Sequence, residues 1–384
     1  MILVMAGHGD IPFRLALSFV PVPIFFFLSG FLYRESKYKS IRHLVRIRAR
    51  TLLVPYFLFA LLNAGIWLAL HRSVLTQGWK PVLLSLAGQV IAGRRTDKDP
   101  YLIPYWFILC LFLTELIYAL LVKAGNAIGA RLWGHRLAWR VLFMAGVVSA
   151  GFVFVNSGHR SLPWSLDIAL IAIAFYGAGH LAQLYPAQFE LLFRKSWLIA
   201  PSIAGLLLGV WNVEAAARYR VGLYDSYYHD PLMFLAGAYS GLCIFLLAMF
   251  RIPDFKPVQV IGRESLAFLV LHYPIFLPIG AFVDRIFSRP IFLALFANKP
   301  LLHSLTMRIL KAVAGTVVTI AGLVAAYFVI APIAVWLRKH LSLLTDGRSR
   351  PEFVGQEAPP EAEPGTRRAD PGLDVLKVSR PASS

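Results

Sequence analysis

The sequence has few charged residues and few cysteines. Only 15% of its 384 residues are Asp, Glu, Lys or Arg, while 58% are hydrophobic. A soluble domain needs more charged surface than this, because charged residues cover much of its outside. Cys110 and Cys243 each lie inside an apolar run, which predicts neither a disulfide framework nor a metal site. The composition therefore indicates an integral membrane protein.

Several signatures of soluble enzymes are also missing. The sequence contains no glycine-rich phosphate loop, no serine-centred hydrolase motif and no metal-ligand spacing. No cleavable signal peptide is visible, since apolar residues follow Met1 without a charged segment. The net charge of +18 does not indicate nucleic-acid binding, because Lys and Arg lie between apolar segments rather than on one continuous face. Positive charge in cytoplasmic loops of a membrane protein is the expected cause.

Apolar segments long enough to cross a membrane recur along the chain. A span needs about 20 mainly apolar residues. A further apolar stub, Met1 to Gly7, is too short, since each helical residue adds only about 1.5 Å. We therefore predict an all-α polytopic transmembrane bundle of about ten spans, the first one truncated in this chain. The complete spans are expected near residues 15–33, 51–70, 102–122, 139–156, 165–183, 197–213, 231–250, 260–283 and 313–337.

The basic residues predict how the bundle is oriented. The densest cluster runs from Arg34 to Arg50 and is expected on the cytoplasmic side. Alternation of the spans then puts the short loop at 157–164 outside, and its low charge agrees. The loops at 71–100 and 284–311 carry several Lys and Arg and do not follow the rule.

The composition changes near residue 345. Residues 1–344 form the predicted membrane domain. We expect it to cross the cell membrane, the inner membrane of a bacterium, several times. Residues 345–384 are rich in Pro, Glu, Arg and Gly and have few aromatic residues. Such a segment buries too little apolar surface to offset its ordering entropy, so we expect a disordered cytoplasmic tail.

Ionisable residues at membrane depth are candidates for function, because each costs several kcal/mol unless paired or hydrated. His8 is suited to take a proton from a hydroxyl near neutral pH, with a solvated interfacial histidine as the alternative. His272 precedes a proline, so it is either a site residue or bonded to a freed backbone carbonyl. Asp167 is a site residue or a helix cap. Glu115 is a site residue or the partner of a basic group on another helix.

Two further segments have a composition that suits ligands. Arg42, Arg46 and Arg50 recur every fourth residue and form one stripe of a helix. This stripe suits either anionic lipid headgroups or the phosphates of coenzyme A. The segment from Tyr224 to Asp230 combines aromatic rings, hydroxyls and carboxylates. It suits a sugar ring, and an ordinary interfacial loop is the alternative interpretation.

Five stretches follow one another in a characteristic order: Met1 to His8, Pro23 to Phe31, Arg50 to Tyr56, Tyr105 to Phe112 and Gly262 to Pro274. They resemble, in turn, a first helix that closes on His, a Phe-rich Ser-Gly-Phe helix, a basic entry before Leu-Pro-Tyr, a Trp-Phe-Leu segment and a late Gly-Ser-His-Pro helix. Together these features resemble the acyltransferase-3 family of integral-membrane O-acyltransferases. The resemblance runs from residue 1 to about residue 337.

The resemblance implies transfer of an acyl group to a hydroxyl, with His8 as the catalytic residue. It adds Trp106 and Ser265 to Asp167, Glu115 and His272 as possible substrate or supporting residues. We also expect acetyl-CoA as the donor, with the arginine stripe defined above as its candidate binding site, and no metal, because the sequence lacks metal-ligand spacing.

A narrower resemblance concerns the acceptor. Pro163 to Asp167, followed by Phe175 to Gly179, is similar to the branch related to fucose 4-O-acetylases, including nodulation-type enzymes. This branch implies a glycan or lipid-linked oligosaccharide as acceptor. Membrane lipids are the other expected partners of the protein.

One departure from the family concerns the first helix. The family pairs its first-helix His with an Arg that lies ten intervening residues upstream, and here only seven residues precede His8. We therefore expect a missing N-terminal segment. A complete first helix that starts inside would place His8 on the outer side, away from the basic cluster.

A transporter or flippase of a lipid-linked glycan is the main alternative function. It would also need many spans, basic loops and polar residues at depth. Paired repeats or matching broken helices are typical of transporters, and the sequence contains no such pairing. A polysaccharide polymerase is a further alternative, but it usually needs a large outer loop.

Overall fold

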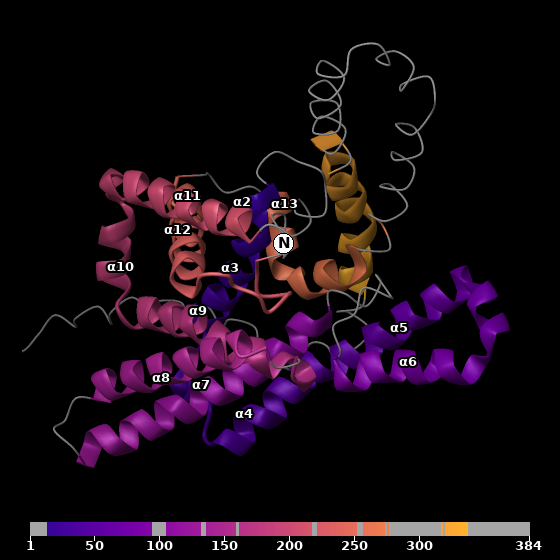
Figure 1. The fold of residues 1–384 in the computed structure, drawn as a ribbon, viewed down its shortest axis with the longest axis horizontal. Helices are drawn as coiled ribbons and strands as arrows, with labels where there is room; N and C mark the ends of the chain where they lie inside the picture. Colours follow the sequence, from indigo (N-terminus) through magenta and orange to yellow (C-terminus); the bar gives the residue numbers. More distant parts are fainter. Residues whose placement is uncertain are drawn as a thin grey trace, which may run out of the picture. The chain divides into compact units, whose positions relative to one another are not determined.

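The computed structural model describes residues 14–93, 105–131, 136–158, 161–216, 221–251, 256–272, 275, 316–317 and 319–336. Within this part of the chain every named element is a helix, which confirms the predicted all-α class (Figure 1). The α-helices are α2 (Arg14–Phe19), α3 (Pro21–Phe31), α4 (Ile41–Arg48), α5 (Val54–Leu70), α6 (Trp79–Ala92), α7 (Trp106–Arg131), α8 (Arg136–Asn156), α9 (Leu166–Leu184), α10 (Pro186–Phe193), α11 (Ile199–Ala215), α12 (Pro231–Met249) and α13 (Lys256–Arg263).

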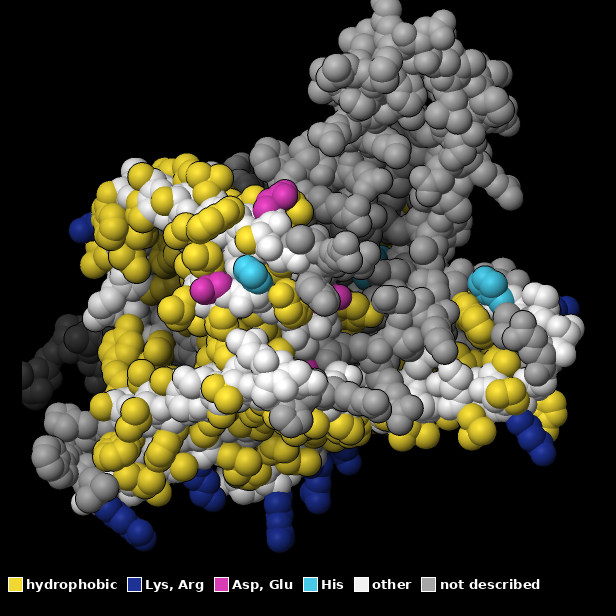
Figure 2. Space-filling model, in the orientation of Figure 1, with side chains coloured by type: hydrophobic (Ala, Val, Ile, Leu, Met, Phe, Trp, Pro, Cys, Tyr) yellow, Lys and Arg dark blue, Asp and Glu magenta, His cyan; other side chains and the backbone are white. Residues whose placement is uncertain are grey.

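Seven helices among the described residues are long and apolar enough to cross a membrane. The predicted count of about ten spans is not confirmed. These seven are Ile41–Ala69, Trp106–Arg131, Arg136–Asn156, Pro163–Leu184, Ser196–Ala215, Pro231–Met249 and Thr319–Trp336. Many of their outward side chains are large and apolar, for example Leu61, Val153 and Leu207. Hydrophobic side chains accordingly cover wide areas in Figure 2, where Lys and Arg gather along the lower edge of the view. The chain is a multi-pass membrane protein.

The predicted span at 15–33 is two helices instead of one. Helix α2 ends at Phe19, and α3 begins at Pro21. A proline has no N–H to donate and its ring crowds the preceding turn, so it is tolerated best in the first turn of a helix. Both Pro21 and Pro23 lie in that first turn. The apolar run alone did not reveal this break.

The predicted span at 51–70 begins earlier than expected. Helix α4 continues through a π-helix (Ala49–Leu53) into α5, so that Ile41–Ala69 forms one continuous span. Ser40 caps its start, since its hydroxyl accepts the N–H of His43 at 3.1 Å. Wide π-type turns are often found at functional sites. This one directly follows Arg48, which is described below.

Helices α3 and α9 lie in close contact through glycines. A Cβ atom on Gly30 would overlap the carbonyl oxygen of Tyr176, and a Cβ on Gly179 would overlap that of Phe27. Small residues at such positions let two membrane helices approach closely. Phe26, Phe27, Phe175 and Tyr176 fill the core beside this contact.

Contacts between loops agree with the predicted alternation of the spans. Glu35, in the turn before α4, pairs with Arg140 near the start of α8. Asp167, at the start of α9, binds Ser226 in the loop before α12. The first pair joins segments expected on the cytoplasmic side, and the second joins segments expected outside. We call these the inner and outer ends of the bundle.

The glycine contact yields a stability prediction. Gly179→Ala should lower the free energy of unfolding by about 1–3 kcal/mol, because the added methyl group forces α3 and α9 apart. Gly146→Ala is the matched control, since a Cβ at exposed Gly146 of α8 meets no atom within 4 Å. It should stabilise by up to about 1 kcal/mol through helix propensity alone. Thermal unfolding of the detergent-solubilised variants measures both, and equal behaviour of the two would contradict the packing argument.

Candidate functional site

A buried ion pair joins α4 to α7. Glu115 lies in α7 and is only 2% exposed, and its Oε2 atom is 2.7 Å from Nε of Arg48 at the end of α4. The ring of Tyr38 lies 5.8 Å from the Arg48 guanidinium. The sequence left open whether Glu115 has a basic partner on another helix, and the structure contains this pair. A carboxylate at this depth would be strongly unfavourable without such a partner.

The three arginines of the predicted stripe point away from the bundle. Arg42, Arg46 and Arg50 are exposed, whereas Leu44 is buried and faces the core with Arg48. Leu44 and Arg48 are four residues apart and therefore share one face of the helix. The exposed stripe leaves both lipid headgroups and coenzyme A phosphates as partners. Sequence reasoning missed Arg48, although its spacing from Leu44 was the available signal.

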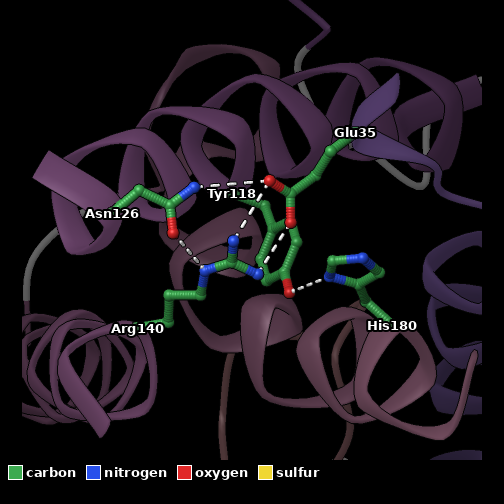
Figure 3. Close-up of polar contacts among 5 residues, drawn as sticks. All are labelled: Glu35, Tyr118, Asn126, Arg140 and His180. Carbon is green, nitrogen blue, oxygen red and sulfur yellow. Dashed lines mark hydrogen bonds and ion pairs between the residues drawn. The ribbon is translucent and has the colours of Figure 1, made fainter. Parts of the chain in front are cut away.

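A second polar cluster lies at the inner end of the bundle, and Figure 3 shows its members. Arg140 holds Glu35 with two guanidinium nitrogens, Nη1 at 2.7 Å from Oε1 and Nη2 at 3.1 Å from Oε2. The Nε–H of Arg140 also donates to Oδ1 of Asn126 at 2.8 Å. Two-point contacts between arginine and a carboxylate fix orientation as well as adding energy. The turn before α4 is therefore anchored to α7 and α8.

A tyrosine–histidine pair adjoins this cluster. The hydroxyl of Tyr118 in α7 lies 2.7 Å from Nδ1 of His180 in α9, and Figure 3 shows the two side chains facing each other. Tyr33 lies edge-on to both rings. Burial, followed by the negative charge of Glu35, raises the pKa of Tyr33 well above its usual value, so its hydroxyl stays neutral. Sequence reasoning also missed His180, which lies inside a predicted span just as His272 does.

Asp167 organises the outer end of the bundle. It is 1% exposed, and its Oδ1 atom accepts the backbone N–H of Leu162 at 3.2 Å. Its Oδ2 atom accepts the hydroxyl of Ser226 at 2.5 Å. Asp167 lies in the first turn of α9 but does not cap it, because the N-cap residue is Ser165 and neither contact of the carboxylate is with an N–H of the helix. The carboxylate binds both the loop that precedes α9 and the loop that precedes α12.

Two tryptophans also lie at the outer end. Trp106 begins α7, and its ring is 5.8 Å from the ring of Tyr224. Trp164, just before α9, donates its indole N–H to the carbonyl oxygen of Ile91 at 2.8 Å. Trp106 and Asp167 were singled out separately from the sequence, and the structure brings both to the loop at 221–230.

The remaining predicted residues lie elsewhere. The Nδ1 atom of buried His272 is 3.0 Å from the carbonyl oxygen of Phe268 and 2.8 Å from that of Leu269. Nδ1 must therefore carry the proton, and the histidine is bonded to backbone carbonyls of its own preceding turn. Ser265 is half-buried on the same helical stretch, residues 265–272. His8 lies outside the described residues, so its catalytic role stays a prediction.

Comparison with known proteins gives one match. The profile of the acyltransferase-3 family, described as an acyltransferase domain, matches residues 1–328. No curated protein and no solved structure matches the chain. The match covers every membrane helix described above except the end of Thr319–Trp336.

The buried ion pair yields a second prediction. Arg48→Met should lower the free energy of unfolding by about 3–5 kcal/mol, because Glu115 is left buried without its cation. Arg46→Met is the matched control and should change it by less than about 0.5 kcal/mol, since Arg46 is exposed. The double variant Arg48→Met, Glu115→Leu should regain most of the loss. Thermal unfolding in detergent checks the three variants, and a double variant no more stable than the single one would contradict the pair's role.

Proposed function

The chain belongs to the acyltransferase-3 family, and on that premise we propose that it moves an acetyl group from acetyl-CoA to a hydroxyl of a sugar or lipid-linked glycan. The family match over residues 1–328 carries the proposal, because it supports membrane acyl transfer as the reaction class. The similarity of Pro163 to Asp167 and Phe175 to Gly179 to the fucose 4-O-acetylase branch supports the carbohydrate acceptor. The proposed location is the bacterial inner membrane.

The arginine stripe supports the choice of donor. Arg42, Arg46 and Arg50 are exposed on one face of a helix at the inner end of the bundle. Guanidinium groups bind phosphate oxygens in a two-point geometry, and coenzyme A carries several phosphates. The proposed donor site therefore begins at this stripe. The Arg48–Glu115 pair lies on the inward face of the same helix.

The proposed reaction transfers the acetyl group from the sulfur of the thioester to the oxygen of the acceptor hydroxyl. His8 takes the proton of the acceptor hydroxyl, and the hydroxyl oxygen forms a bond to the acetyl carbonyl carbon. The carbon–sulfur bond of the thioester breaks, and the leaving thiolate receives the proton from His8. Transient acetylation of His8 is a variant of the same reaction, in which the histidine nitrogen first accepts the acetyl group.

Transfer of radiolabelled acetyl from acetyl-CoA into the glycolipid fraction of membranes tests this proposal. Membranes contain the complete gene product, including any upstream coding sequence, or the same protein with His8→Ala. We expect label with the first and a loss of at least about 100-fold with the second, the usual contribution of a general base. Retention of label in His8→Ala would show that His8 is not the catalytic base, and His272 would be tested next. A well-expressed protein without transfer would contradict the enzymatic proposal and favour the transporter.

The donor site yields a separate prediction. Replacing Arg42, Arg46 and Arg50 together by Gln should raise KM for acetyl-CoA about tenfold or more, because each charge-assisted contact contributes about 1 kcal/mol or more. The maximal rate should change much less, since these side chains bind the donor away from the reacting bond. Lys195→Gln, an exposed cation also expected on the cytoplasmic side, is the control. An unchanged KM in the triple variant would favour lipid headgroups as the partner of the stripe.

A further inference from the structure

We infer that the loop at 221–230, held in place by Asp167, binds the sugar ring of the acceptor at the outer end of the bundle. This inference rests on the proposed function, since it names where the acceptor of that reaction binds. Two sequence features lead to it, the aromatic and polar segment from Tyr224 to Asp230 and the segment from Pro163 to Asp167. They are separated by about 60 residues, and the hydrogen bond from Ser226 to Asp167 joins them.

The loop has a defined shape. The N–H of Gly222 donates to the carbonyl oxygen of Tyr227 at 3.1 Å and closes a turn. The side chain of Asn212 in α11 donates to the carbonyl oxygen of Tyr228 at 2.9 Å and accepts the N–H of Asp230 at 3.1 Å. Tyr228 itself is buried against Phe234. The loop is therefore fixed at both ends and along its middle, as a preformed binding site requires.

Strained backbone is concentrated at this end of the bundle. Trp164, Ser165, Ser226 and His229 have left-handed φ angles of 57°, 55°, 49° and 51°, and among the described residues no other non-glycine residue has one. A left-handed conformation disfavours side chains with a Cβ atom and persists only where the surrounding structure imposes it. The first two residues precede α9 and the last two lie in the loop, so the Asp167 contact joins two strained segments.

The exposed side of the loop presents groups that suit a carbohydrate. Asp225 and His229 are exposed, and Tyr224 and Tyr227 are half-buried. The rings of Tyr227 and His229 lie 6.5 Å apart and 37° from parallel. Aromatic faces pack against the C–H groups of a sugar ring, while a carboxylate and an imidazole bind its hydroxyls.

An ordinary interfacial loop explains these features less well. Tyr and Trp do collect at membrane surfaces, and that alone would account for exposed rings. A role at the membrane surface does not explain why the Asp167 carboxylate is only 1% exposed and bound through both oxygens. Burying such a charge costs free energy, which a loop without a specific role would avoid. The ring of Trp106 packs against that of Tyr224, so the aromatic side chains of the loop continue into α7. The proposed outer position of His8 is on the same side of the membrane.

Ligand binding without the donor tests the inference. Saturation-transfer NMR on nanodisc-embedded protein measures binding of p-nitrophenyl α-fucoside and p-nitrophenyl β-glucoside. We expect saturable binding, weakened about five- to tenfold in Tyr227→Ala and in His229→Ala, the size of effect expected for one aromatic contact. Tyr185→Ala is the matched control, since Tyr185 is an exposed tyrosine at the opposite end of α9 and should bind as the unchanged protein does.

The outcomes separate the inference from the proposed function. Acetyl transfer with an acceptor KM that Tyr227→Ala and His229→Ala leave unchanged would overturn the acceptor site and keep the enzyme. Glycoside binding that is weakened in these variants and kept in Tyr185→Ala would support the sugar site even if no acetyl transfer were observed. Absence of saturable binding by either glycoside to the unchanged protein would overturn the inference. His229 is exposed, so loss of folding does not obscure its variant.

Discussion

The ion pair between Arg48 and Glu115 is the contact on which the inner end of the bundle depends. It turns one face of α4 toward α7, and Leu44, four residues earlier, packs on the same face. Arg42, Arg46 and Arg50 lie on a different face of the same helix, so they point away from the bundle. A single buried carboxylate thus determines where a whole stripe of positive charge is presented. The two-point contact of Arg140 with Glu35 fixes the turn that leads into this helix.

The outer end of the bundle also contains a buried carboxylate, but its partners are neutral. This carboxylate is that of Asp167, and a backbone N–H and a hydroxyl bind it. Close packing through small residues also joins the helices, as at Gly30 and Gly179, the latter one residue before His180. Buried polar groups are thus satisfied by specific partners, while small residues let the helices approach closely.

The sequence predicted long apolar helices well and specific partners poorly. The spans at 139–156 and 165–183 match α8 and α9 closely, because hydropathy over about 20 residues responds only to the membrane. The break at Val20 and the early start at Ile41 were missed, since prolines and an amphipathic first turn change little in such a window. Glu115 was singled out from its cost at depth, but its partner depends on the packing of α4 on α7, and no local pattern contains that information.

The distance between the two ends constrains how a transfer reaction could work. Trp106 and Glu115 are nine residues apart on α7, which corresponds to about 14 Å of helix. The arginine stripe flanks Arg48, the partner of Glu115, so a donor bound there and a sugar bound at the loop at 221–230 are separated by about this length of helix, roughly half of a hydrocarbon core of about 30 Å. Direct attack therefore requires the thioester arm of the donor to enter the bundle between the helices. A histidine that first accepts the acetyl group removes the need for donor and sugar to be bound together, although the thioester arm must still reach that histidine.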